Sequence, residues 1–314
     1  MALDDQPLTD VHATQREELL AGLLEPPRSI NPKFFYDERG SELFAEICEL
    51  EEYYPTRTEI AILEQQAAAI AETVGRGCEL VEPGAGNCEK VRYLLADLEP
   101  TAYLPLDISR DFLLDAAQRL REDFPGLDVR PVVADFSDSF DLPAATGRRV
   151  LFYPGSTIGN FEPAAAREFL LRSAQLVGQG GGLLIGVDLH KSSEVLNAAY
   201  NDSRGVTAAF NRNILHHANH LLDSDFDPEQ FAHVAFYNSA AQRIEMHLES
   251  RSDQQVNCDG TVLEFAAGER IHTEYSHKYT LEGFAALAAG AGFEARGRWL
   301  DDASLFSVQY FEVA

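Results

Sequence analysis

From Cys78 onward, the sequence alternates short apolar runs with stretches of helical periodicity, and this alternation constrains the fold more than any other feature. Such a pattern is typical of a parallel sheet with helices on both faces. The apolar runs predict strands at Cys78–Val81, Tyr103–Leu106, Val129–Val133, Val150–Tyr153 and Leu183–Val187. Helices are predicted at Glu89–Leu98, Asp111–Phe124 and Ala164–Val177. Five such strands indicate a doubly wound, Rossmann-like α/β sheet.

The alternation stops after Asp188, where a different pattern begins. The segment Ser192–Arg270 reads as helices followed by strands, two of which are predicted at His233–Tyr237 and Ile244–Leu248. A change from alternating elements to separate helices and strands indicates an inserted α+β lobe. The first 60 residues precede the sheet, and we expect this helical segment to pack with the insertion.

The doubly wound pattern resumes near the C-terminus with a predicted helix at Leu281–Ala289. Two strands follow near Phe293–Trp299 and Phe306–Phe311, with no helix between them. This ending predicts an antiparallel hairpin at the sheet edge, which is common in methyltransferases and unusual in dehydrogenases. We therefore expect an N-terminal segment, a sheet domain and an inserted domain, at residues 1–60, 61–190 with 277–314, and 191–276.

A glycine-rich turn, Glu82-Pro83-Gly84-Ala85-Gly86-Asn87, follows the first predicted strand. Ligands bind open α/β sheets at this kind of position, and glycines let the backbone approach them closely. The dinucleotide motif needs a third glycine where this chain has Glu89, so a pyrophosphate would meet a carboxylate. A zwitterionic methionine tail tolerates Glu82 near its ammonium group and Lys90 near its carboxylate. The turn alone is also compatible with a simple strand-to-helix connection.

Acidic residues end the next two predicted strands. Asp107 lies 21 residues after Gly86 and is placed to accept hydrogen bonds from both ribose hydroxyls. Asp135 and Phe136 follow the third strand, where a carboxylate can accept from an adenine amino group and a ring can stack on the base. Each residue alone has an ordinary surface or core interpretation. Their occurrence at consecutive strand ends favours S-adenosylmethionine as the ligand.

The formal net charge of −26 excludes several classes of partner. A strongly acidic chain repels nucleic-acid phosphates and anionic lipids, so we expect neither nucleic acid nor membrane as a partner. The charge is compatible with solubility in a salty cytoplasm. No apolar run approaches the roughly 20 residues needed to span a bilayer. The polar, acidic start Met1–Leu20 lacks the order of a secretory signal, which predicts a cytoplasmic protein.

Several longer motifs together carry a family resemblance that covers nearly the whole chain. They are Lys33-Phe34-Phe35-Tyr36-Asp37, Glu52-Tyr53-Tyr54-Pro55-Thr56-Arg57, Gly155-Ser156-Thr157-Ile158-Gly159-Asn160, Gly205-Val206-Thr207-Ala208-Ala209-Phe210-Asn211 and Arg270-Ile271-His272-Thr273-Glu274-Tyr275-Ser276. With these motifs the sequence resembles the L-histidine Nα-methyltransferases of ergothioneine biosynthesis, whose relatives include fungal enzymes acting on tryptophan derivatives. Pro83 and Ala85 depart from the leucine and serine expected in the donor turn.

The resemblance implies a role for each matching residue. Methyl-donor positions are matched by Gly84, Lys90, Asp107, Asp135, Phe136 and Gly155. Positions that hold the α-amino and carboxylate groups are matched by Tyr53, Asn160 and Tyr200, and Tyr36 lies near the reacting amine. Glu274 and Ser276 match residues that hydrogen-bond the imidazole, and Met246 matches a residue beside it. Tyr36 and Asn160 are thus the expected catalytic residues, and 191–276 is the expected substrate-binding domain.

The implied reaction is the transfer of three methyl groups from S-adenosylmethionine to the α-amino group of L-histidine, giving hercynine. A monomer without a metal is expected. Methyl transfer is a direct displacement, so positioning supplies most of the catalysis and no covalent nucleophile is needed. A carboxylate such as Glu274 accepts the imidazole N–H, which favours histidine over tryptophan. The alternatives are an N-methyltransferase for another amino acid or amine, a catalytically silent scaffold, and an NAD-dependent dehydrogenase.

Individual residues also have structural interpretations. Asn160 is compatible with a cap on the following helix. Strand alternation would place Glu274 on a solvated face. Core packing is the common role of a lone tyrosine, and it applies here to Tyr53, Tyr54 and Tyr200. His216, His217 and His220 lie in a helical pattern that indicates a polar helix surface, because no carboxylate completes a zinc signature.

Overall fold

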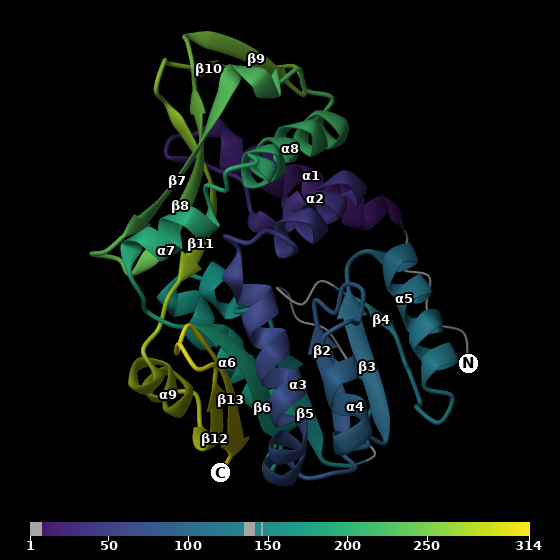
Figure 1. Ribbon diagram of the computed structural model, residues 1–314. Helices are drawn as coiled ribbons and strands as arrows, with labels where there is room; N and C mark the ends of the chain where they lie inside the picture. Colours follow the sequence, from purple (N-terminus) through teal and green to yellow (C-terminus); the bar gives the residue numbers. More distant parts are fainter. Residues whose placement is uncertain (1–7, 135–141, 146) are drawn as a thin grey trace. The chain divides into compact units, whose positions relative to one another are not determined.

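A seven-stranded sheet organises one part of the chain, in the order β12-β13-β6-β5-β2-β3-β4 among the described residues (Figure 1). The computed structural model describes residues 8–134, 142–145 and 147–314. The parallel strands are β2 (Glu79–Pro83), β3 (Ala102–Asp107), β4 (Val132–Val133), β5 (Arg149–Tyr153) and β6 (Gly182–Asp188). The closing strands β12 (Phe293–Leu300) and β13 (Phe306–Val313) pair antiparallel, and β12 is the edge strand. The predicted fold class and closing hairpin are confirmed.

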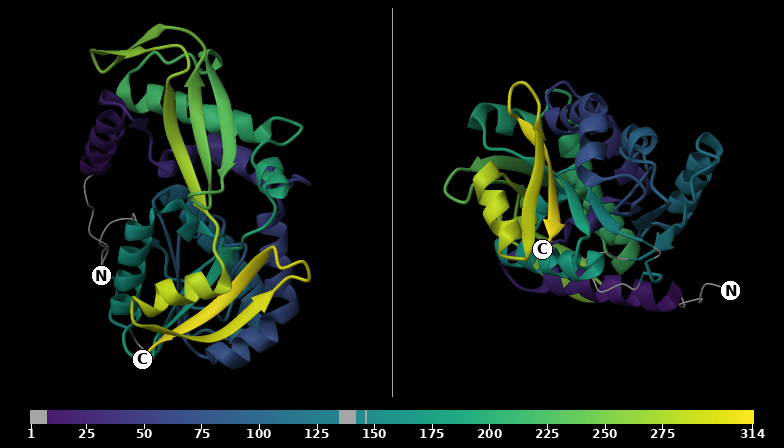
Figure 2. Two further views of the ribbon diagram at one scale, coloured as in Figure 1. Left: turned by 90° about the vertical axis from the view of Figure 1, so that its left-hand side faces the viewer. Right: turned by 90° about the horizontal axis from the view of Figure 1, so that it is seen from below.

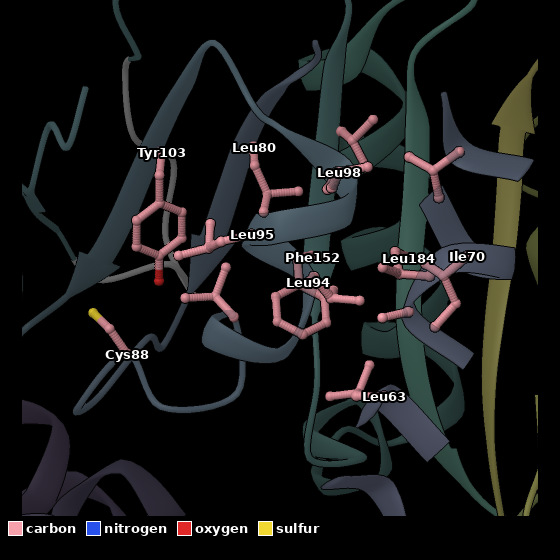
Figure 3. Packing of buried hydrophobic residues seen from close by; sticks show 14 of the residues in the cluster. Leu63, Ile70, Leu80, Cys88, Leu94, Leu95, Leu98, Tyr103, Phe152 and Leu184 are labelled. Carbon is pink, nitrogen blue, oxygen red and sulfur yellow. The ribbon is translucent and has the colours of Figure 1, made fainter. Parts of the chain in front are cut away.

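Helices cover both faces of this sheet, as a doubly wound fold requires. Those on one face are α3 (Tyr54–Val74), α4 (Arg92–Leu98) and α5 (Arg110–Asp123). Those on the other are α6 (Pro163–Val177) and α9 (Leu281–Ala289). Buried strand residues such as Leu80, Phe152 and Leu184 pack against the first face's helices (Figure 3). Because β2, β3, β5 and β6 are buried on both sides, they read as largely apolar runs in the sequence.

The chain divides into two compact units. The sheet belongs to the unit Pro55–Lys191 with His277–Ala314, here called the sheet unit. The other unit, Met1–Tyr54 with Ser192–Ser276, is here called the lobe unit. None of the helices in the described part of the chain is long and apolar enough to cross a membrane.

The lobe unit is built on a four-stranded sheet in the order β1-β11-β8-β7. These strands are β1 (Arg28–Ser29), β7 (Phe231–Asn238), β8 (Arg243–Ser250) and β11 (Arg270–His277). The helix α8 (Val206–Leu222) packs against β7 and β8 (Figure 2), and α1 (Leu8–Leu24) and α2 (Glu38–Cys48) pack on α8. The lobe unit also contains the short helix α7 (Ser193–Ala199), a hairpin of β9 (Gln254–Cys258) and β10 (Thr261–Phe265), and two 3-10 helices, Pro32–Phe35 and Pro228–Gln230.

In the sheet unit, the segment that leaves after β6 pairs with the segment that returns before α9. Leu189 forms a parallel bridge with Tyr279, and the N–H of Tyr279 donates to the carbonyl of Asp188 at 3.1 Å. The Asp188 carboxylate binds two ammonium groups, Lys191 Nζ at 2.5 Å and Lys278 Nζ at 2.8 Å. All three side chains are buried. This triad therefore joins the two chain segments that lead to and from the insertion.

Candidate functional site

The turn between β2 and α4 has the backbone shape that the glycines predict. Gly84 and Gly86 have φ angles of 66° and 53°, in the left-handed region that favours glycine. A Cβ added at Gly86 would meet nothing within 4 Å, so this backbone borders open space. A turn of this shape at the carboxyl end of a parallel strand fits a ligand that approaches the main chain closely.

Asp107 is the last residue of β3 and is tied to this turn. Its Oδ2 accepts from the N–H of Gly86 at 3.1 Å, and its Oδ1 accepts from the N–H of Ser109 at 2.9 Å. Burial raises the pKa of the Asp107 carboxyl, while the hydrogen bonds from Ser109 and Gly86 act in the opposite direction. Asp107, predicted to accept hydrogen bonds from the ribose hydroxyls, thus lies beside the glycine turn predicted to bind the methyl donor.

The Glu82 side chain is buried inside the sheet unit, with 2% of its surface exposed. Its Oε2 accepts a hydrogen bond from the Tyr103 hydroxyl at 2.6 Å. Burial raises the pKa of Glu82 from its usual 4.5 to about 8, although the Tyr103 hydrogen bond and the charge of Lys90 lower it. The Glu82 carboxyl is therefore protonated at neutral pH in the folded chain.

Glu82→Gln is expected to remove a pH-dependent loss of stability. Between pH 4.5 and about 8, the unfolded chain releases the Glu82 proton while the folded chain retains it. The free energy of unfolding therefore falls with rising pH across this window, by up to about 1.4 kcal/mol per pH unit from this group. Glutamine cannot ionise, so the variant should gain stability relative to the native chain as pH rises. Urea unfolding at several pH values tests this, and a constant difference would contradict it.

Lys90 and Gly155, two residues predicted to bind the methyl donor, both contact one carboxylate. Lys90 Nζ lies 2.6 Å from Oε2 of Glu59, a residue of α3. The N–H of Gly155, in the loop after β5, lies 2.9 Å from each oxygen of the same carboxylate. Sequence reasoning missed Glu59, because an acid within a helix usually lies on its solvated face. Its position two residues after Arg57 of a quoted motif was an available signal.

The loop after β5 has an unusual backbone and is held from two sides. Gly155 and Ser156 both have positive φ angles, 82° and 56°. This conformation is strained for serine, and such strain is found at functional sites. Ser156 Oγ accepts from the N–H of Asp188 at 2.9 Å. A Cβ added at Gly159 would lie 2.8 Å from the carbonyl oxygen of His277. The loop is therefore fixed against the end of β6 and the returning chain.

Asn160 is the last residue of a short 3-10 helix, Thr157–Asn160, and is half-buried. The next helix, α6, begins at Pro163, and its N-cap residue is Glu162. The interpretation of Asn160 as a helix cap is therefore wrong. Its place directly after the strained loop is compatible with the predicted role in binding and catalysis, which stays a prediction.

The lobe unit brings three predicted tyrosines into one aromatic group, consisting of Tyr36, Phe44, Tyr53, Tyr200 and Phe210. Ring centroids of Tyr36 and Phe44 are 5.6 Å apart, and those of Tyr53 and Tyr200 are 6.3 Å apart, both edge-to-face. Tyr36 is 40% exposed, whereas Tyr200 is buried. Burial raises the pKa of the Tyr53 phenol well above its usual value, and the charges of Tyr200 and Glu274 add to this. Tyr53 therefore remains a hydrogen-bond donor at neutral pH.

The β11 strand carries the predicted imidazole-binding residues, and both are buried. Alternation slips by one residue in this strand, because Thr273 and Glu274 are both buried while His272 and Tyr275 are both half-exposed. The interpretation of Glu274 as a solvated residue is therefore wrong. Ser276 Oγ accepts a hydrogen bond from the Tyr200 hydroxyl at 2.9 Å. This contact links β11 to the aromatic group.

Met246, from the neighbouring strand β8, has 1% of its surface exposed. It lies among the buried apolar residues of the lobe unit. Its predicted place beside the imidazole remains a prediction.

The histidines of the predicted cluster and the predicted adenine contacts add no further site among the described residues. His217 Nδ1 lies 2.7 Å from the carbonyl oxygen of Phe34, so this histidine is engaged with the main chain. In residues 8–134, 142–145 and 147–314, no group of three or more His, Cys, Asp or Glu side chains is arranged to hold a metal ion. Asp135 and Phe136, the predicted adenine contacts, lie outside the described residues.

Comparison with known proteins identifies close relatives. Residues 15–313 match the model of a family described as histidine-specific methyltransferase, SAM-dependent. The chain is 42% identical over 299 residues to a histidine N-alpha-methyltransferase of Mycolicibacterium smegmatis, covering 93% of each chain. It is 30% identical to ergothioneine biosynthesis protein 1 of Neurospora crassa, covering 87% of this chain and 32% of that protein. The solved mitomycin 7-O-methyltransferase shares the fold, with a TM-score of 0.51, 11% identity, and coverage of 96% of this chain and 68% of that one.

Proposed function

We propose that this chain, which belongs to the family of histidine-specific, S-adenosylmethionine-dependent methyltransferases, transfers three methyl groups in succession to the α-amino group of L-histidine. The product would be Nα,Nα,Nα-trimethylhistidine (hercynine), in the first step of ergothioneine biosynthesis. The chain is an S-adenosylmethionine-dependent N-methyltransferase. The observation that carries the choice of substrate is the burial of Glu274 beside Ser276 on β11.

Burial of these two polar residues favours an imidazole as the recognised group. A neutral imidazole presents one N–H donor together with one acceptor nitrogen. Glu274 would accept from the N–H, and the Ser276 hydroxyl can serve the other nitrogen. An indole has a single N–H and no acceptor, so it would use only one of these groups. Discrimination by buried polar groups is strong, because an unmatched partner leaves them unpaired.

The aromatic group suits a product with a permanent positive charge. Trimethylation converts the amine into a quaternary ammonium, which aromatic faces stabilise by about 0.5–2 kcal/mol. Tyr36 is the exposed member of the group and is the residue we assign to the reacting amine. Tyr53 and Tyr200 are assigned to the amino and carboxylate groups, together with Asn160 of the sheet unit. Because burial keeps the Tyr53 phenol protonated, it acts as a donor to the substrate carboxylate rather than as a base.

The sheet unit fits the amino-acid and ribose parts of the methyl donor. The open space beside Gly86 and the acceptor oxygens of Asp107 suit a nucleoside with two hydroxyls. Lys90 and Gly155 would hold the donor's methionine end, and Asp135 and Phe136 would hold its adenine. When bound, S-adenosylmethionine supplies an electrophilic methyl group on a sulfonium. The residues of the chain orient a neutral amine towards that carbon, which is where positioning lowers the barrier.

The proposal is tested by supplying S-adenosylmethionine and one free amino acid at a time, followed by mass spectrometry. Histidine should gain the mass of three methyl groups. A gain on tryptophan or another amine instead would establish the alternative substrate class, and no gain on any amino acid would refute the proposal. The expectations of a cytoplasmic monomer without metal, nucleic-acid or membrane partners stay predictions.

A further inference from the structure

Glu59, in the first turns of α3, is an acidic residue with none of its surface exposed. Burying a carboxylate is costly unless charges and hydrogen-bond donors compensate it. Here the compensation comes from two separate loops: the Lys90 ammonium at 2.6 Å, and the Gly155 N–H at 2.9 Å from both oxygens. The carboxylate thus joins the chain that follows the β2 turn to the chain that follows β5.

The neighbouring strand is shaped to admit this side chain. A Cβ added at Gly186 of β6 would lie 1.9 Å from Oε1 of Glu59, so any larger residue would displace the carboxylate. A Cβ added at Gly155 would lie 3.2 Å from Lys90 Nζ, which shows how closely the ammonium approaches that loop. Two glycines in different elements therefore leave room for one ion pair.

We propose that Glu59 is a positioning residue of the methyl-donor site, whose carboxylate holds the Lys90 ammonium and the main chain at Gly155 where they border the methionine end of the donor. The inference rests on the proposed donor site, because both residues are assigned to it. The Glu59 carboxylate supplies the common acceptor that sets their spacing.

Glu59→Gln tests this with little change in volume. An amide oxygen in the place of Oε2 could still accept from both Lys90 and Gly155, but the amide carries no charge and its NH₂ would face the Gly155 N–H. In the other orientation the NH₂ would face the Lys90 ammonium, so either orientation loses the charge-assisted hydrogen bond. Charge-assisted hydrogen bonds are the strongest of the common types, so losing one should weaken donor binding about tenfold or more. The KM for histidine at saturating donor should change less than about twofold, because the substrate residues are not altered.

The measurement is calorimetric titration of S-adenosylmethionine and S-adenosylhomocysteine into the native chain and into Glu59→Gln. Glu64→Gln is the matched control, because it makes the same change at an exposed position of α3. Partial unfolding would lower the binding stoichiometry and leave the dissociation constant unaltered, so the two effects separate. If Glu59→Gln does not fold, Glu59→Asp keeps the charge with a shorter reach and should show the same weakening.

A double-mutant cycle with Lys90→Met tests the route of the effect. If Glu59 acts through Lys90, the losses in donor affinity should be less than additive in the double variant. Native-like donor affinity in Glu59→Gln, or fully additive losses, would overturn the inference. Failure of the native chain to bind either nucleoside would overturn the donor site itself, and with it the proposed function.

Discussion

Asp188→Ala is expected to lower the free energy of unfolding by about 3–5 kcal/mol, the usual cost of removing one partner from a buried ion pair. The carboxylate of Asp188 is enclosed with the ammonium groups of Lys191 and Lys278. Burial alone would raise the pKa of Asp188, but the attraction of Lys278 and Lys191 outweighs it and holds the pKa below its usual value. Alanine would remove the carboxylate that both buried ammonium groups share.

Urea unfolding of the purified variant measures this loss. Asp302→Ala is the matched control, because it removes an exposed aspartate of the same unit. Burial already lowers the pKa of Lys191 to about 8. Without the attraction of Asp188, Lys191 should release its proton more readily on folding, so the variant should become more stable as pH rises. A loss in free energy of unfolding below about 1 kcal/mol, or no gain in stability with rising pH, would show that the Asp188 triad does not stabilise this junction.

Glu274→Ala is expected to raise the KM for histidine about 10- to 100-fold while the dissociation constant for the donor stays unchanged. A hydrogen bond to a charged group contributes about 1.5–3 kcal/mol, which gives a change of this size. Steady-state kinetics with histidine, together with calorimetric donor titration, measures both quantities. Glu264→Ala removes an exposed glutamate of β10 and serves as the control. Equal weakening of donor and histidine would contradict the assigned role.

The sheet unit was largely predictable because its elements have clear periodicity. The helix at Leu281–Ala289 has the predicted bounds, and its N-cap Thr280 accepts from the N–H of Gly283. The helix predicted from Glu89 begins only at Arg92, because Cys88 has a positive φ angle and extends the turn. The pattern of apolar residues does not predict a positive φ angle at a single residue. Similarly, the third strand is regular only over Val132–Val133, where it lies at the sheet edge.

The site was predictable only in part, for reasons that lie in tertiary contacts. Strand ends and glycine turns mark the donor region in the sequence, since both depend on local chemistry. Glu59 gives no comparable signal, because its burial depends on Gly155 and Gly186 from other elements. Strict alternation predicts a solvated Glu274, and the slip beside Thr273 is decided by packing. The burial of Glu59 and Glu274 therefore depends on residues distant in sequence, which the local pattern does not reveal.

The bridge between Leu189 and Tyr279 also bears on how such enzymes diversify. Since the outgoing and incoming segments already lie next to each other, a segment of any length can be spliced between them without stretching the sheet. The inserted part of the lobe unit can thus be exchanged at this junction, whereas residues 1–54 of that unit join the sheet unit separately, before Pro55. Chimaeras cut after Lys191 and before His277 would preserve Asp188 and both lysines, and with them the junction.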